Sequence, residues 1–176
     1  MLTSPEYDRR RPLAYFLTWT CYGTWLHGDE RGSADRDHNV YGTPYLPPDL
    51  RRNRARPERL DQLPYELDEL RRDVVLDAIR GHCDFRGWTL HAAHVRSNHV
   101  HVIVSAAIAP ERLLNDLKSY ISRRMNERGL DASQRKRWTR HGSTRYIWTK
   151  EALAEKVTYV VHQQGKPMSV FFVTAK

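Results

Sequence analysis

Residues 88–105 read WTLHAAHVRSNHVHVIVS, and this stretch decides the fold. Trp88–Arg96 and Asn98–Ser105 are both rich in residues that favour strands. Little more than the tight-turn pair Ser97-Asn98 separates them. The pattern therefore predicts a β-hairpin in the middle of the chain.

The flanking segments supply the other elements. Before the hairpin, Leu13–Thr20 predicts a strand and residues 65–83 predict a helix. After it come a helix from Pro110 to Gly129, a strand over Ser143–Thr149 paired in a hairpin that begins near Trp138, a helix over Lys150–Gln164, and an apolar tail over Met168–Val173 that adds a strand or docks on the core. The order β-α-β-β-α-β-α predicts an α+β, ferredoxin-like sandwich. Its central antiparallel sheet would have helices on one face and a site on the other.

Length and composition indicate one domain over residues 1–176, with residues 22–64 as a long irregular insertion rich in Gly and Pro. No apolar run approaches the roughly 18 residues of a membrane span. The first seven residues hold no apolar signal core, so a cytoplasmic protein is expected. Cys21 and Cys83 lack CxxC spacing and are expected to be reduced and buried.

The net charge of +8 and the pI of about 9.7 are typical of a nucleic-acid-binding protein, although a merely basic soluble surface is the plainer alternative. Cations gather in two clusters: Arg51, Arg52, Arg54, Arg56 and Arg59, and then Lys118, Arg123, Arg124, Arg128, Arg135, Lys136, Arg137 and Arg140. Aromatic residues lie near the second: Tyr120, Trp138, Tyr146 and Trp148. Cations for phosphates and rings for unstacked bases suit single-stranded DNA, but these rings would serve equally well in a core.

The second strand of the hairpin carries a histidine pair. Side chains alternate along a strand, so Val100, Val102 and Val104 face the core while His99 and His101 share the other face. Two residues of rise separate the imidazoles by roughly 7 Å, which lets both reach one divalent ion. Two half-exposed strand histidines are the plainer alternative.

The last predicted helix carries a tyrosine outside its apolar stripe. Leu153, Val157, Val160, Val161 and Gln164 fall within one arc. Tyr159 and Gln163 lie off that arc, one turn apart, with Lys156 beside them. A tyrosine on the surface with no function would give the same sequence pattern. Tyr120 is the competing tyrosine, but it lies on the apolar stripe of its own helix and is expected in the core.

The strand Asn98-His-Val-His-Val-Ile-Val resembles the HUH motif, in which a bulky hydrophobic residue separates two histidines. The segment Tyr159-Val-Val-His-Gln163 resembles the nucleophile helix of single-tyrosine HUH transposases. Over residues 13–167 the chain looks most like the REP-associated tyrosine transposases and their relatives in the IS200-like group. The resemblance implies that His99 and His101 bind Mg²⁺ or Mn²⁺, that Gln163 is a third ligand and that Tyr159 is the nucleophile.

The function implied is that of a metal-dependent, single-stranded DNA endonuclease and transposase. Tyr159 would attack a DNA phosphate to give a 5′-phosphotyrosine and a free 3′-OH, and strand transfer would follow. Lys156 is expected to stabilise the phosphate, with Arg123, Arg124, Arg137 and Arg140 as further DNA contacts. The substrate is expected beside a hairpin repeat. A monomer is favoured over a homodimer, although IS200-like relatives can share the tyrosine helix between subunits.

Alternatives remain at this point. Many REP-associated members have Asn-Pro after the tyrosine helix where this chain has Gln163-Gln164-Gly165, so His162 or Gln164 could supply the third ligand. A domesticated or inactive DNA-hairpin-binding protein would share the fold. An HUH replication initiator or relaxase would usually be larger. A separate metal site would use loop residues whose spacing fits a solvated polar loop better: His27, Asp29, Asp35, Asp37 and His38.

Overall fold

The computed structural model describes residues 11–24 and 60–173 of the chain. In chain order the elements are β1 (Ala14–Thr20), α2 (Glu69–Arg86), β2 (Thr89–Val95), β3 (His99–Ser105), α3 (Pro110–Glu127), β4 (Ser143–Ile147), α4 (Lys150–His162) and β5 (Ser169–Phe172). Residues 25–59 lie outside this description, and with them the first arginine cluster and the alternative loop metal site.

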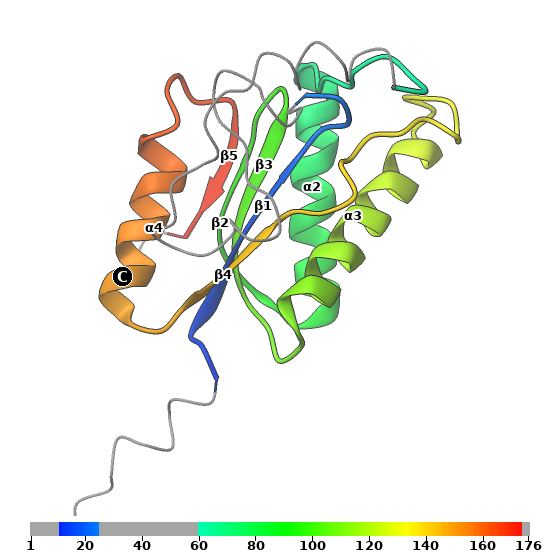
Figure 1. The fold of residues 1–176 in the computed structure, drawn as a ribbon. Coiled ribbons are helices and arrows are strands. Elements are labelled where there is room, and N and C mark those ends of the chain that lie inside the picture. Colours follow the sequence, from blue (N-terminus) through cyan, green and yellow to red (C-terminus); the bar gives the residue numbers. More distant parts are fainter. Residues whose placement is uncertain (1–10, 25–59, 174–176) are drawn as a thin grey trace, which may run out of the picture.

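The strands form one five-stranded sheet in the order β4-β1-β3-β2-β5 (Figure 1). Every neighbouring pair is antiparallel. This is the ferredoxin-like arrangement for the elements from β1 to β4, and β5 extends it beside β2. The predicted α+β fold is confirmed, and the histidine strand β3 is the central strand of the sheet.

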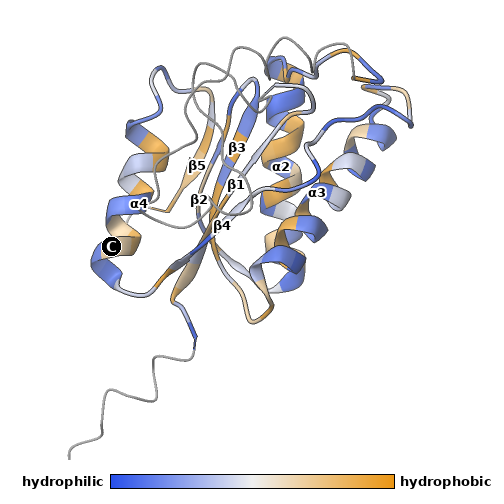
Figure 2. Cartoon of the chain, viewed as in Figure 1, coloured by the Kyte–Doolittle hydropathy of each residue, from blue (hydrophilic) through white to orange (hydrophobic). Residues whose placement is uncertain are grey.

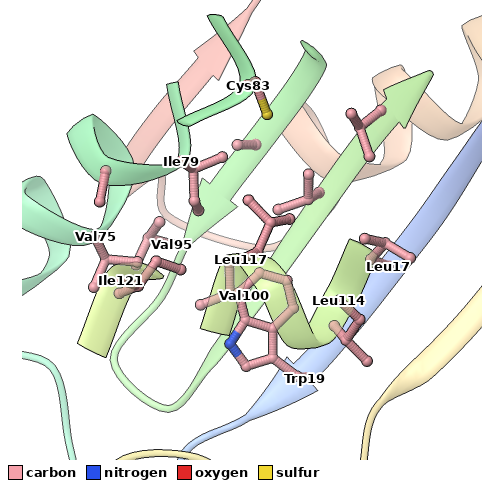
Figure 3. Close-up of a cluster of buried hydrophobic side chains, with 14 of the residues drawn as sticks. Leu17, Trp19, Val75, Ile79, Cys83, Val95, Val100, Leu114, Leu117 and Ile121 are labelled. Atoms are coloured by element: carbon pink, nitrogen blue, oxygen red, sulfur yellow. The ribbon is translucent and has the colours of Figure 1, made fainter. Parts of the chain in front are cut away.

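Helices α2 and α3 cover one face of the sheet and enclose the larger core (Figure 1). Val100, Val102 and Val104 face this side, as their alternation predicts. Figure 3 shows how Leu17, Trp19 and Val100 meet side chains of the two helices, among them Ile79, Leu117 and Ile121. Hydrophobic residues follow the strands and the inner sides of the helices, while hydrophilic residues follow the outer turns of α3 and α4 (Figure 2). Cys21 and Cys83 are free and buried, as expected.

The expectation that all helices lie on one face is wrong, because α4 packs on the opposite face (Figure 1). Val160 and Val161 of α4 belong to a second buried cluster with Phe16, Ala92 and Ile103. These strand residues are apolar on the side that the prediction left open, and α4 removes them from water. α4 therefore covers part of the face that carries the histidines.

The predicted hairpin between Trp138 and β4 is also wrong. β4 pairs with β1, and the backbone of Trp138 forms an isolated bridge to Cys21 instead of a strand beside β4. Within the described residues no helix is long and apolar enough to cross a membrane.

A β-bulge changes the register within β2. Leu90 pairs with Val104 of β3, but Ala92 pairs with Ile103, so His91 is an extra residue on one strand. Beyond the bulge His94 lies directly opposite His101. If residues 90–94 alternated regularly, His94 would lie on the same face as Leu90, towards α2 and α3.

Candidate active site

His99 and His101 lie side by side on the face of β3 that α4 partly covers, with ring centroids 4.8 Å apart. Each Nδ1 atom has an oxygen partner. His99 Nδ1 is 2.7 Å from Asn98 Oδ1, and His101 Nδ1 is 2.8 Å from Thr18 Oγ1 on β1. In the tautomer in which Nδ1 donates to these oxygens, both lone pairs lie on Nε2, which is the arrangement that metal-binding histidines use.

Burial keeps His101 neutral. Its side chain is only 6% exposed. Desolvation, followed by the neighbouring His99, lowers the pKa of His101 from 6.5 to about 3. A neutral imidazole is the form that binds a metal ion, so His101 keeps its ligand form throughout the physiological pH range.

Tyr159 of α4 lies over this histidine strand. Its ring centroid is 6.1 Å from that of His101 and 6.1 Å from that of Phe16, edge-on in both cases. The Tyr159 side chain is 36% exposed, so a substrate can reach it. Lys156 places its Nζ atom 5.6 Å from the Tyr159 ring centroid. The structure thus brings together four residues that the sequence singled out for one site: His99, His101, Lys156 and Tyr159.

Of the two neighbouring glutamines, Gln164 rather than Gln163 meets the histidines. Gln164 Oε1 accepts a hydrogen bond from His101 Nε2 at 3.2 Å, and Gln164 Nε2 donates to the Tyr159 carbonyl at 3.4 Å. Gln163 is the exposed C-cap of α4. The periodicity argument failed here because α4 ends at His162, so helical spacing does not apply to residue 164.

The donor set fits a divalent ion. The Nε2 atoms of His99 and His101 and the Oε1 atom of Gln164 supply two imidazole nitrogens and one amide oxygen, which leaves ligand positions for a phosphate. An ion at His101 Nε2 would need the tautomer in which Nδ1 donates to Thr18. Among the described residues there is no group of three or more His, Cys, Asp and Glu side chains that could hold a metal.

The sequence missed Thr18 and Phe16 as site residues. Both precede the histidines by more than eighty positions, and only strand pairing brings them close. Thr18 is the register partner of His101, and Phe16 is the partner of Ile103. The alternation along β1 could have placed the two on one face, but the order of the strands was needed to identify that face.

The predicted DNA contacts do not form one surface. Arg123 and Arg124 lie on α3, across the sheet from the histidines, where Arg123 covers the Tyr120 ring and Arg124 pairs with Glu127. Arg140 is exposed. Of the five predicted contacts, Lys156 is the one beside Tyr159.

The prediction that Arg137 is a surface DNA contact is wrong, because its side chain is only 4% exposed. Arg137 Nε donates to Asp131 Oδ2 at 2.9 Å, and Nη2 donates to Asn126 Oδ1 at 2.7 Å. Asp131 also accepts from the Tyr65 hydroxyl at 2.6 Å and from Arg71. Arg137 therefore ties the segment after α3 to the end of α3, and Asp131 links that segment to Tyr65 and to Arg71 of α2.

Replacing Arg137 with Ala is expected to lower the free energy of unfolding by about 3 kcal/mol, since it removes a partner from a nearly buried carboxylate. The exposed Arg140 is the matched control, and Arg140→Ala should change stability by no more than about 0.5 kcal/mol. Urea unfolding of the two variants checks this. If Arg137→Ala left stability unchanged and weakened DNA binding, Arg137 would be a DNA contact after all.

The buried His101 also predicts an acid sensitivity of the fold. In the unfolded chain a histidine takes up a proton near pH 6.5, whereas folded His101 does so only near 3. The unfolded state therefore binds more protons between these values, and stability falls by about 1.4 kcal/mol for each pH unit below 6.5. Burial lowers the pKa of His91 and His94 as well, which adds to the trend.

Urea unfolding at pH 7 and pH 5 measures this loss. In a His101→Asn protein the difference between the two pH values should be smaller than in the wild type by about 2 kcal/mol. If the stability difference between pH 7 and pH 5 were the same in both proteins, folded His101 would take up its proton near its ordinary pKa of 6.5.

The four aromatic residues near the second basic cluster separate into two pairs. Tyr120 stacks on His82 with ring centroids 4.2 Å apart, and Trp138 packs edge-on against Trp19, so both pack against the core. Tyr146 and Trp148 on and after β4 are 49% and 51% exposed, with nearly parallel rings 5.8 Å apart. Only the second pair is available to a nucleic-acid base.

Comparison with known proteins identifies the family of this chain. The sequence model of the family described as "Transposase IS200 like" matches residues 66–163, which include both histidines and Tyr159. A solved structure of a REP-associated tyrosine transposase bound to a REP hairpin is similar at 11% identity and a TM-score of 0.45, covering 87% of this chain and 67% of that one. No curated protein matches the chain. Because the family match spans more than half of its residues, the chain belongs to the IS200-like transposase family.

Proposed function

We propose that this protein is a metal-dependent endonuclease and transposase of single-stranded DNA that cuts through Tyr159. One observation carries the proposal: the exposed Tyr159 ring lies 6.1 Å from the ring of His101, whose neighbour His99 shares the same strand face. Within one chain the phenol already lies beside the imidazole pair, so we propose that the protein acts as a monomer. His99, His101 and Gln164 would hold the Mg²⁺ or Mn²⁺ ion.

In the proposed cleavage step, the Tyr159 oxygen forms a bond to the scissile phosphorus and the bond from phosphorus to the 3′ oxygen breaks. The phenol proton passes to solvent, and the departing 3′ oxygen takes up a proton. The products are a 5′-phosphotyrosine and a free 3′-OH. Attack by another 3′-OH on the phosphotyrosine reverses these changes and joins new strands, which is the transfer step of transposition.

Each side chain of the site has a separate task in this reaction. A bound divalent ion would supply positive charge to the non-bridging phosphate oxygens. Lys156 would add positive charge beside the Tyr159 ring, where it can contact the phosphate under attack. Thr18 and Asn98 orient the two imidazoles through their Nδ1 atoms. Phe16 packs edge-on against the Tyr159 ring and would limit the positions that this ring can take.

We propose that the substrate is single-stranded DNA beside a hairpin. The net charge of +8 supports contact with phosphates. The exposed rings of Tyr146 and Trp148 would take unpaired bases at the β4 edge of the sheet, where Tyr146 packs against Tyr15 on the α2 and α3 side. A protein that keeps the hairpin-binding surface without the chemistry would bind the same DNA and leave it intact.

A doubly labelled oligonucleotide tests the proposed function. A hairpin with a single-stranded flank carries one dye at its 5′ end and another at its 3′ end, and is incubated with the protein and Mn²⁺. The dye 3′ of the cut should migrate with the denatured protein, and the 5′ dye should leave on a shorter strand with a free 3′-OH. Binding without any cleaved strand would favour the inactive hairpin-binding protein. Cleavage that leaves both dyes free of protein would contradict covalent chemistry.

The two adjacent glutamines provide a matched pair for the metal site. Gln164→Ala is expected to raise the Mn²⁺ concentration for half-maximal cleavage by about tenfold or more, because it removes an oxygen donor beside His101. Gln163→Ala removes an exposed amide and should leave that concentration within about twofold. A metal titration of cleavage rate checks both variants. If Gln163→Ala raised this Mn²⁺ concentration and Gln164→Ala did not, Gln163 would be the third ligand.

A further inference from the structure

Strand β2 carries two side chains, His94 and Arg96, that the proposed reaction does not use. They are two residues apart on one strand, on the face towards α4. Both contact the backbone of the segment that follows Tyr159. That segment contains Gln164, so these contacts bear on the geometry of the site.

His94 joins β2 to α4 and to the start of β5. Its side chain is fully buried, with 0% exposure. Nδ1 lies 2.8 Å from the carbonyl oxygen of Val160, the residue after Tyr159, and Nε2 accepts a hydrogen bond from the amide of Met168 at 3.2 Å. One donor and one acceptor specify a neutral imidazole with its proton on Nδ1. Through these two bonds the ring joins the end of α4 to the start of β5.

Arg96 completes the contact from the same strand. Its Nη1 atom donates to the carbonyl oxygen of Lys166 at 3.1 Å and lies 3.5 Å from His94 Nε2. Together His94 and Arg96 hold the backbone at residues 160, 166 and 168. Gln164 lies between the first two of these points, and its side chain reaches His101.

The bulge in β2 makes this arrangement possible. Because His91 is an extra residue, His94 pairs with His101 across neighbouring strands and both point to the α4 face. The residue that holds α4 and the histidine of the site are therefore register partners. A shift in one would pass directly to the other through the sheet.

We propose that His94 and Arg96 form a clasp that positions Tyr159 and Gln164 against His101. They act as positioning residues, since neither is placed to touch the substrate or the ion. The inference rests on the proposed function for its catalytic consequence, but the clasp itself can be tested without DNA cleavage. Loss of the clasp lets the end of α4 move, which weakens the metal site and misplaces the nucleophile.

The test compares His94→Ala with His94→Asn, and uses His91→Ala as the control. Asn can place an amide N–H near the position of Nδ1 and keep the bond to Val160, whereas Ala removes both bonds. His91 is on the same strand, but its bond is to Ser105, away from the site. Mn²⁺ binding is measured by calorimetry without DNA, and amide hydrogen exchange is followed over residues 159–168.

His94→Ala should weaken Mn²⁺ binding by about tenfold or more. It should also speed exchange across residues 159–168, most of all at the Met168 amide, and lower kcat more than it raises KM. His94→Asn should restore most of the Mn²⁺ affinity, and His91→Ala should match the wild type in all three readouts. If His94→Ala fails to fold, Arg96→Ala, whose side chain is only partly buried, gives the same test with smaller effects.

Equal Mn²⁺ affinity and equal exchange in the His94→Ala and His91→Ala proteins would overturn the clasp, even if the melting temperature fell. A wild-type protein that cleaves no DNA would overturn the proposed function instead. In that case faster exchange over residues 159–168 in His94→Ala alone would still support the clasp as a conformational device.

Discussion

Tyr159→Phe is expected to abolish the covalent protein–DNA adduct and to lower cleavage by about 10³-fold or more, because the phenol oxygen is the proposed nucleophile. The ring is kept, so the edge-on contacts with His101 and Phe16 remain. Stability and DNA binding should therefore stay close to those of the wild type. The adduct is measured on denaturing gels with a labelled oligonucleotide, and folding by thermal unfolding.

Tyr120→Phe is the matched control for this loss. Tyr120 was the competing tyrosine in the sequence, and it stacks on His82 between α2 and α3, on the far side of the sheet from the site. This variant should form adduct at the wild-type rate. Adduct formation by Tyr159→Phe, or its loss in Tyr120→Phe, would assign the nucleophile elsewhere.

His101→Ala is expected to remove metal-dependent cleavage, by about 10²-fold or more at any Mn²⁺ concentration. The reason is that the imidazole would supply one ligand of the ion and lies beside the nucleophile ring. The substitution also removes the nearly buried imidazole to which Thr18 and Gln164 are hydrogen-bonded. The free energy of unfolding should therefore fall by about 1–3 kcal/mol. The loss of activity must therefore be measured where the variant is folded.

Calorimetric titration with Mn²⁺ separates the two effects. Below its melting temperature His101→Ala should bind Mn²⁺ far more weakly than the wild type, while His91→Ala should bind it normally. Full cleavage by folded His101→Ala would mean that the ion binds elsewhere or is not used.

The fold was predictable because β3, the second strand of the central hairpin, has a clear alternation. Val100, Val102 and Val104 face the core of α2 and α3, while His99 and His101 face the other side. The helical period on α4 turned Tyr159 away from the buried valines, and the structure places it over the histidines. Both predictions rest on the fixed period of a strand or a helix, which determines the face of each residue from its position along the chain.

The remaining features depend on contacts between distant segments. The third residue at the histidines is Gln164 rather than Gln163 because α4 stops at His162, and Gly165, which has a φ of 75°, marks that end only to within two residues. Arg137 looks like any other cation of its basic segment until Asp131 and Asn126 fold against it. The bulge at His91, which turns His94 towards α4, has no Gly to signal it.

The most direct test of the account is to identify the residue that carries DNA after cleavage. The protein is reacted with a hairpin oligonucleotide in Mn²⁺ and digested with protease and nuclease. Mass spectrometry then locates the nucleotide that remains attached. The account predicts a nucleotide joined through its 5′ phosphate to Tyr159. A nucleotide on any other residue, or cleaved DNA with no residue modified, would contradict it.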